Sequence, residues 1–338
     1  MSSFILRTIT SDMPNLQNRE LYAARYFFKT GLLHYAFNDV WCKKLVFVHK
    51  KQEKNMKLIS YRKEGKAHFG AVSGDGVVEL TRRFAQVPDL ASFLANPLLV
   101  QEARKVVETV QPDYPFSSIQ LESVIPNPGK VICVGINYVA HAEEAGRKVG
   151  EFPVIFQRFA ETLLPHGEPL VRPQVSEQFD FEAELAVVIG KGGAHIDPAD
   201  AMDHVAGYTC FNDASVRDWQ FHTHQYGMGK TFRKTGALGP WVIPASEIPD
   251  YRKLVVRGVL NGEQLQEGSL SELAFDIPHL ISYVSKALPW NPGDILATGT
   301  PSGIGFKRNP PIFLKPGDVF EVVITEIGTL SNGVIDEA

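Results

Sequence analysis

Runs of hydrophobic residues recur along the chain from Met56 onward, and their lengths and spacing predict a fold rich in β-strands. The first runs, within residues 56–80, are separated by Glu64-Gly65 and by Ser73-Gly74-Asp75-Gly76, which both favour hairpin turns. Asn261-Gly262 predicts a further hairpin of type I′. The later runs predicted as strands are 130–138, 153–158, 168–172, 179–190, 205–213, 238–243, 253–266, 293–298 and 319–327.

Helical spacing occurs in fewer segments. Residues 89–110 are predicted as helical with a break at Pro97, a short polar helix is expected over 140–148, and 275–288 is the clearest later helix. Strands and helices do not alternate regularly, as they would around a parallel sheet. The expected fold class is therefore β-dominated α+β.

Turn-forming residues mark one domain boundary. Residues 112–129 end in Pro126-Asn127-Pro128-Gly129 and are expected to form a loop. This boundary separates a small N-terminal β-rich domain, over 56–125, from a larger domain over 126–338.

Residues 1–55 differ in charge from the rest of the chain. They hold nine Lys or Arg against four Asp or Glu, which leaves 25 basic and 34 acidic residues from the totals of 34 and 38. We expect a poorly ordered extension or an upstream-start artefact here. An organellar transit peptide is the alternative, and no secretory pattern is present.

Composition excludes several classes of protein. The 338 residues are 44% hydrophobic and 21% charged, as in an ordinary globular protein, and the net charge of −4 gives no basic signature for nucleic-acid binding. No apolar run reaches the ~18 residues of a membrane span. Three cysteines without a CxxC pair favour a reduced, cytoplasmic setting. No GxGxxG motif follows a predicted strand and no Walker loop is present, so the sequence gives no support for nucleotide-dependent chemistry.

Three acidic residues interrupt the hydrophobic run at 179–190. Asp180, Glu182 and Glu184 stand two apart, so on a strand their side chains would share one face while the residues between them face a core. Three negative charges on one strand face repel one another, and a divalent cation such as Mg²⁺, Mn²⁺ or Ca²⁺ bound between them would offset that repulsion. On spacing alone, the solvated face of an edge strand is the alternative.

Further polar residues follow other predicted strands. Asp213 ends an apolar run, which suits a catalytic ligand or equally a helix N-cap. Lys230 stands in the glycine-rich segment 226–241, which would let backbone approach a ligand or would form a plain surface loop. Residues 293–305 end an apolar strand in a Gly/Thr/Pro/Ser turn able to offer amides to an anion.

His141 is a candidate general base. His141 and Glu144 are three apart, so on a helix they share a face, and the carboxylate would orient the imidazole and raise its basicity. The alternative is a surface His–Glu pair on a polar helix.

Together these segments resemble the fumarylacetoacetate hydrolase family. The resemblance runs from about Lys130 to Ile327, and the region from Met56 is similar to the family's small N-terminal domain. The motifs that carry it are ICVGINYVAHAEE, FEAELAVVIGK, GYTCFNDASVRDWQ, GKTF, GALGPW and LATGTPSGIG. The fold implied for residues 126–338 is the family's mixed β-sandwich roll.

The resemblance implies a divalent metal, Mg²⁺ or Mn²⁺, held by Glu182, Glu184 and Asp213. Asp180 is not one of the motif ligands, and we expect it either to support the ligands or to be exposed.

The resemblance also implies catalytic and substrate-binding roles. His141 and Glu144 match the family's water-activating pair on a mobile lid helix, and Lys230 matches the lysine beside the metal. Gln220 and Thr300 match substrate-contacting positions, and Arg217 and Asp218 match supporting ones.

The chain departs from the family pattern near the expected pocket. Arg158-Phe159 stands where many relatives have Lys-Pro, and Arg233 where many have Asp. Both changes put the substrate in doubt more than the metal site. Arg158 is expected to grip an additional substrate carboxylate bidentately, which a lysine cannot do.

The reaction implied first is hydrolysis of a carbon–carbon bond in a ketonic substrate. The substrate would be a 2,4-dioxo acid of the acylpyruvate type, such as maleylpyruvate or fumarylpyruvate from aromatic-compound breakdown, and the products pyruvate and a carboxylic acid. Decarboxylation or isomerisation of an oxaloacetate-like or hydroxymuconate-type acid is the alternative, and a catalytically silent binding or structural protein is the alternative of another class. The resemblance suggests a homodimer, and the net charge and apolar runs give no sign of a nucleic-acid or membrane partner.

Overall fold

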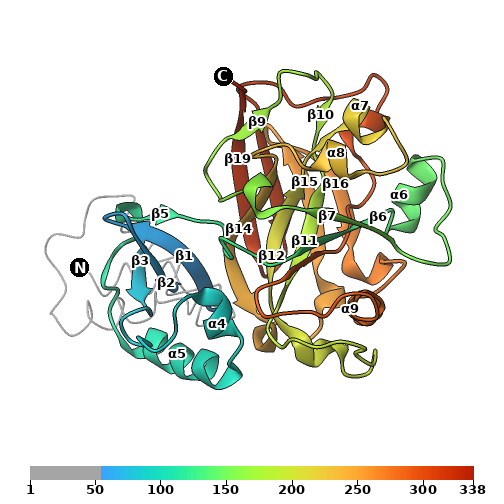
Figure 1. Ribbon diagram of the computed structural model, residues 1–338. Helices are drawn as coiled ribbons and strands as arrows, with labels where there is room; N and C mark the ends of the chain where they lie inside the picture. Colours follow the sequence, from blue (N-terminus) through green and yellow to red (C-terminus); the bar gives the residue numbers. More distant parts are fainter. Residues whose placement is uncertain (1–54) are drawn as a thin grey trace, which may run out of the picture. The chain divides into compact units, whose positions relative to one another are not determined.

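The computed structural model describes residues 55–338, and strands dominate this part of the chain (Figure 1). The strands are β1 (Lys57–Lys63), β2 (Lys66–Ser73), β3 (Gly76–Glu79), β4 (Tyr114–Pro115), β5 (Gln120–Leu121), β6 (Val131–Gly135), β7 (Val154–Arg158), β8 (Leu163–Leu164), β9 (Leu170–Arg172), β10 (Phe179–Asp180), β11 (Ala183–Ile189), β12 (Val205–Asp213), β13 (Ser215–Val216), β14 (Gly236–Pro244), β15 (Val255–Leu260), β16 (Glu263–Ser269), β17 (Ile295–Ala297), β18 (Val319–Ile324) and β19 (Gly328–Asp336). The α-helices are α4 (Leu90–Leu94), α5 (Pro97–Thr109), α6 (Val139–Glu144), α7 (Arg217–Gln220), α8 (Gly227–Lys230) and α9 (Ile277–Ser285). The 3-10 turns are η1 (Phe116–Ser118), η2 (Ala160–Thr162), η3 (Ala201–His204), η4 (Ala245–Glu247), η5 (Tyr251–Lys253), η6 (Leu270–Glu272) and η7 (Gly305–Lys307). The β-dominated α+β class is confirmed.

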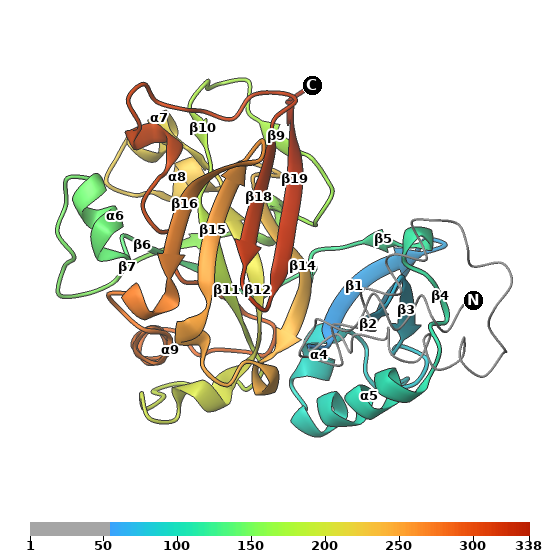
Figure 2. The same ribbon diagram turned by 180° about the vertical axis from the view of Figure 1, so that it is seen from behind.

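In the larger region, a five-stranded sheet packs face to face on part of a 12-stranded sheet that continues into the N-terminal region. A mixed 12-stranded sheet has the order β4-β3-β2-β1-β14-β12-β11-β17-β6-β7, with β5 and β8 added at its sides, and a five-stranded sheet has the order β16-β15-β18-β19-β9. Figure 2 shows the five-stranded sheet in front of β11 and β12. Phe181 stacks on Phe320 of the facing sheet, with ring centroids 4.6 Å apart. Because both of its faces are covered, every residue of β11 is buried, and all of them except Glu184 are apolar.

Turn chemistry fixes the hairpins as the sequence predicts. Glu64-Gly65 and Asn261-Gly262 all have positive φ, which is the type I′ requirement. Pro97 divides the predicted helix by starting α5, with the Asn96 side chain accepting the Leu98 amide as the N-cap. β12 has the bounds predicted for its run.

The two predicted domains share a sheet and a core. β1 pairs with β14 through Leu58 and Val242, and one hydrophobic cluster joins Phe93 of the N-terminal region to Phe211 of the larger one. The described residues 55–338 belong to one compact unit.

Some expectations fall on residues that the structure does not describe. The predicted extension over residues 1–55, except Asn55, lies outside the described residues, as does Cys42. Cys133 and Cys210 are buried free thiols. None of the helices within residues 55–338 is long and apolar enough to cross a membrane.

Candidate active site

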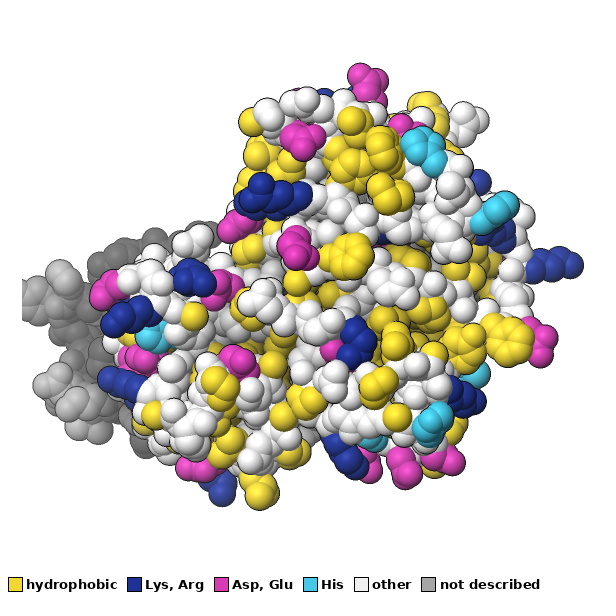
Figure 3. All heavy atoms as spheres, in the orientation of Figure 1, with side chains coloured by type: hydrophobic (Ala, Val, Ile, Leu, Met, Phe, Trp, Pro, Cys, Tyr) yellow, Lys and Arg dark blue, Asp and Glu magenta, His cyan; other side chains and the backbone are white. Residues whose placement is uncertain are grey.

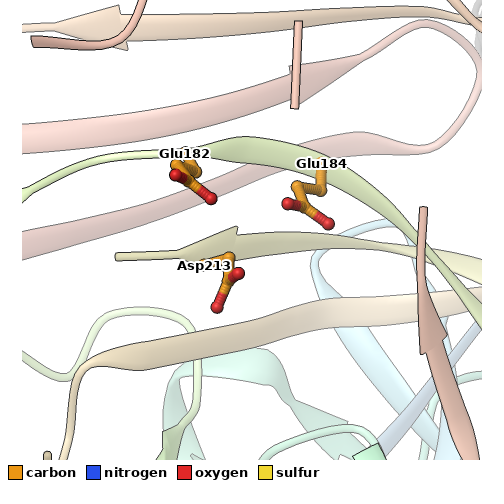
Figure 4. A group of neighbouring side chains, drawn as sticks. All are labelled: Glu182, Glu184 and Asp213. Atoms are coloured by element: carbon orange, nitrogen blue, oxygen red, sulfur yellow. The ribbon is translucent and has the colours of Figure 1, made fainter. Parts of the chain in front are cut away.

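Three buried carboxylates meet where two neighbouring strands begin and end. Glu182 precedes β11, Glu184 lies within it, and Asp213 is the last residue of β12 (Figure 4). The Asp213 amide donates to the Glu182 carbonyl at 2.9 Å, which brings the two side chains to the same end of the sheet. One carboxylate oxygen from each residue lies within 4.8 Å of the others. This buried all-oxygen set fits a hard divalent cation such as Mg²⁺ or Mn²⁺.

Two cations sit against these carboxylates. The Lys230 ammonium lies 2.7 Å from Glu182 and 2.8 Å from Asp213, and the Arg217 guanidinium lies 2.7 Å from Glu182. Lys230 reaches the buried carboxylates because α8 packs tightly on α7. A Cβ atom at Gly229 would lie only 2.5 Å from the Gln220 backbone. The glycine in this segment therefore serves close packing, and the lysine is buried rather than solvated.

The environment separates the pKa values of the two glutamates. Burial raises the pKa of Glu182, but Lys230 and Arg217 outweigh it and bring the pKa down to about 2. Burial, followed by the charges of Asp213 and Glu182, holds the pKa of Glu184 well above its usual range. Glu184 accepts only the Gly299 amide, at 2.9 Å, and no cation contacts it among the described residues. A divalent ion would relieve this repulsion.

Metal binding should therefore release a proton. A protonated Glu184 must ionise to become a ligand, so Mn²⁺ affinity should rise with pH until the pH exceeds the raised pKa of Glu184. Calorimetric titration of Mn²⁺ in two buffers of different ionisation enthalpy should show release of up to about one proton per ion. Glu177→Gln, at an exposed carboxylate, should leave this release unchanged; equal heats in both buffers for the parent protein would contradict it.

The predicted base pair forms on α6. His141 Nδ1 lies 3.1 Å from Glu144 Oε2, and Glu144 Oε1 accepts the Gly303 amide at 2.9 Å. His141 is buried and lines the cavity. With Nδ1 held by a carboxylate, Nε2 is the ring nitrogen left to exchange protons with a bound molecule.

The predicted substrate-binding residues Gln220 and Thr300 line the same cavity, whereas Arg158 does not. The cavity is lined by His141, Glu182, Arg217, Gln220, Lys230 and Thr300, by two further basic residues, and by mostly apolar and aromatic side chains. Gln220 accepts a hydrogen bond from Arg217 at 2.8 Å. The Thr300 hydroxyl donates to the Ala183 carbonyl at 3.0 Å, which fixes the Gly/Thr/Pro/Ser turn against the start of β11.

The prediction that Arg158 grips a substrate carboxylate is wrong. Its side chain is fully buried, pairs with Asp213, and also donates to the Ala214 carbonyl and the Thr235 hydroxyl. These bonds use all three nitrogen atoms of the guanidinium group, so none is left to bind a substrate carboxylate. Arg158 also does not line the cavity. Arg158 instead fixes the Asp213 carboxylate from behind.

Of the two roles expected for Asp180, support or exposure, the structure shows the supporting one, whereas Asp218 does not contact the three carboxylates. Asp180 is fully buried, not exposed: its carboxylate accepts Arg217 Nε at 2.8 Å and the amides of Gly305 and Phe306 at 2.9 Å each. It thus holds Arg217 against Glu182. Asp218 accepts the Ser176 hydroxyl at 2.6 Å and the Trp219 amide, so it shapes α7 without touching the carboxylates.

Sequence reasoning missed Gln266. This buried side chain accepts the Ala183 amide at 3.0 Å and donates to the Thr300 hydroxyl at 2.8 Å, tying β16 to the site. It lies in a strand of mostly polar residues, so no sequence signal distinguished it.

Comparison with known proteins shows the family to which this fold and site belong. Residues 130–335 match the family described as fumarylacetoacetate (FAA) hydrolase C-terminal. The chain belongs to this family of enzymes.

Individual relatives differ in their named activities. The chain is 42% identical to the mitochondrial oxaloacetate tautomerase fahd2 of Xenopus laevis, over 70% of this chain and 75% of that protein. Among solved structures, it resembles maleylpyruvate hydrolase from Sphingobium sp. SYK-6, in complex with manganese(II) ion and pyruvate, at a TM-score of 0.69 and 26% identity, over 84% of this chain and 100% of that one. It also resembles 5-carboxymethyl-2-hydroxymuconate delta-isomerase from Mycobacterium smegmatis, at a TM-score of 0.66 and 28% identity, over 83% of this chain and 100% of that one.

Proposed function

We propose that this protein is a metal-dependent tautomerase that interconverts the keto and enol forms of oxaloacetate or a closely related 2-oxo diacid. The observation that carries the proposal is that His141 and Lys230 line one cavity together with Glu182, one of the three clustered carboxylates. The named activity of the Xenopus relative supports this reaction over the hydrolysis expected from the sequence.

The reaction needs one proton to move between two atoms of the substrate. His141 Nε2 would take the proton from C3 of the keto form, so that the C3–H electron pair becomes the C2–C3 double bond, and the proton would then be delivered to the C2 oxygen. Glu144 stabilises the imidazolium formed in between, because it contacts Nδ1 at 3.1 Å. Lys230 and Arg217 place positive charge beside the oxygen on which negative charge develops.

Three carboxylates, Glu182, Glu184 and Asp213, would hold the metal. A bound Mg²⁺ or Mn²⁺ supplies Lewis-acid charge and a template for the 2-oxo carboxylate group. The neighbouring Thr300 and Gln220 then limit how the substrate lies between this end of the cavity and His141.

Replacing His141 by alanine should lower kcat for oxaloacetate tautomerisation by about 10²–10⁴-fold, the usual contribution of general acid–base catalysis. The assay follows the ultraviolet absorbance of the enol form with Mn²⁺ present. Mn²⁺ affinity should be unchanged, because His141 is not a ligand. His279→Ala, at an exposed histidine of α9, is the matched control. Parent-like kcat in His141→Ala would remove His141 from the mechanism.

Hydrolysis of an acylpyruvate is the second candidate function. It is supported by the similarity to the maleylpyruvate hydrolase and by the same His141–Glu144 pair, which could activate water. Incubating the Mn²⁺-loaded protein with maleylpyruvate and with oxaloacetate separates the two. Pyruvate from maleylpyruvate, without tautomerisation of oxaloacetate, would favour hydrolysis.

A further inference from the structure

Two exposed basic side chains, Arg147 and Lys307, line the open end of the active-site cavity. They differ from the two deep cations, since Lys230 and Arg217 are each paired with two carboxylates. Within residues 55–338, neither Arg147 nor Lys307 forms an ion pair with an acidic side chain. The open end therefore carries two positive charges available to an anion.

Backbone geometry places Arg147 directly after the catalytic helix. Gly146 has a φ of 69°, the Gly146 amide donates to Glu143 at 2.9 Å, and the Arg147 amide donates to Ala142 at 2.8 Å. This pair of bonds is a Schellman motif, which closes α6 and turns the chain sharply. The Arg147 guanidinium then lies 5.8 Å from the centre of the Tyr226 ring and donates to the Tyr226 hydroxyl. Tyr226 orients the arginine without neutralising it.

Lys307 approaches from another loop. It ends η7, whose Gly305 and Phe306 amides are fixed by the buried Asp180. Its ammonium lies 5.4 Å from the Phe306 ring centre, a contact that leaves its charge in place. Two separately anchored segments thus each bring one cation to the same opening.

We propose that Arg147 and Lys307 bind the second carboxylate of the substrate and so select 2-oxo diacids over 2-oxo monoacids. This inference rests on the proposed function, because it takes the 2-oxo carboxylate end to occupy the deep carboxylate site. The rest of the molecule then extends toward the opening, where the cations stand. On the face shown in Figure 3, basic and acidic side chains are interspersed, so local charge rather than a broad field would attract the dianion.

The test is the double variant Arg147→Gln/Lys307→Gln. Exposed ion pairs are each worth up to about fivefold in affinity, so KM for oxaloacetate should rise about 5- to 20-fold while kcat changes less than about twofold. Calorimetric binding to the Mn²⁺-loaded protein should show the same loss for oxaloacetate. Oxalate carries the same charge but is too short to extend from the deep site, so its Kd should be unchanged.

Lys148→Gln is the matched control, because Lys148 is the exposed neighbour of Arg147 and does not line the cavity. Equal oxaloacetate Kd in parent and double variant, or an equal loss of oxalate and oxaloacetate binding, would overturn the proposal. If the parent binds oxaloacetate without tautomerising it, the proposed function fails while the Kd comparison still decides the role of the two cations. Failure of the parent to bind oxaloacetate at all would overturn both.

Discussion

Glu182→Gln should abolish Mn²⁺ binding and bring oxaloacetate tautomerisation down to the uncatalysed rate. The neutral amide is a poor ligand for a hard cation, and it also removes the charge that Lys230 and Arg217 contact at 2.7 Å. Calorimetric titration with Mn²⁺ and the enol absorbance assay measure the two losses. Both should disappear together, because one side chain serves both.

The fold should survive this substitution. Lys230 keeps Asp213 as a partner and Arg217 keeps Asp180, so neither buried cation is left without a carboxylate. Glu177→Gln, at an exposed position a few residues earlier, should behave like the parent protein. A folded Glu182→Gln variant that binds Mn²⁺ as tightly as the parent would disprove the carboxylate site.

Asp180→Ala should lower the free energy of unfolding by about 3–5 kcal/mol, although Asp180 is no ligand. Its carboxylate accepts Arg217 and three backbone amides, those of Phe181, Gly305 and Phe306. Alanine leaves these buried donors without an acceptor. Urea unfolding of the metal-free protein measures the loss.

Asp336→Ala is the comparison for this prediction. Asp336 also pairs with an arginine, Arg172, at 2.7 Å, but its side chain is 53% exposed. Its loss should cost less than about 1 kcal/mol, as for most surface ion pairs. If Asp180→Ala were no more costly than Asp336→Ala, the buried network would not stabilise the fold.

The sequence predicts those parts of the fold whose conformation depends on residues close together in the chain. Hairpins at Glu64-Gly65 and Asn261-Gly262 follow from residues that tolerate positive φ. β12 was predicted with its observed bounds because its largely apolar run ends at the polar pair Asn212-Asp213. The meeting of Glu182, Glu184 and Asp213 came from resemblance, since nothing in the spacing pairs β11 with β12.

Features that depend on partners distant in sequence escaped prediction. The strand predicted over 179–190 is interrupted before Ala183. The Asp180 side chain there accepts hydrogen bonds from the Arg217 guanidinium and from the Gly305 amide of η7, which lie far away in the sequence. β19 was missed because a polar residue, Asn332, occupies a core position, where its amide donates to the carbonyls of Pro165 and Glu168. Arg158 was assigned to substrate because its buried partner, Asp213, lies 55 residues away.

Asp180 also has a consequence for how this enzyme can diversify. Its bonds to η7 go to the amides of Gly305 and Phe306, and a backbone amide is present whatever side chain the residue carries, proline excepted. Side chains at 306 and 307 can therefore change while the anchored backbone, and Arg217 behind it, stay in place. The selectivity of the opening is free to drift in evolution without disturbing the chemistry at the closed end.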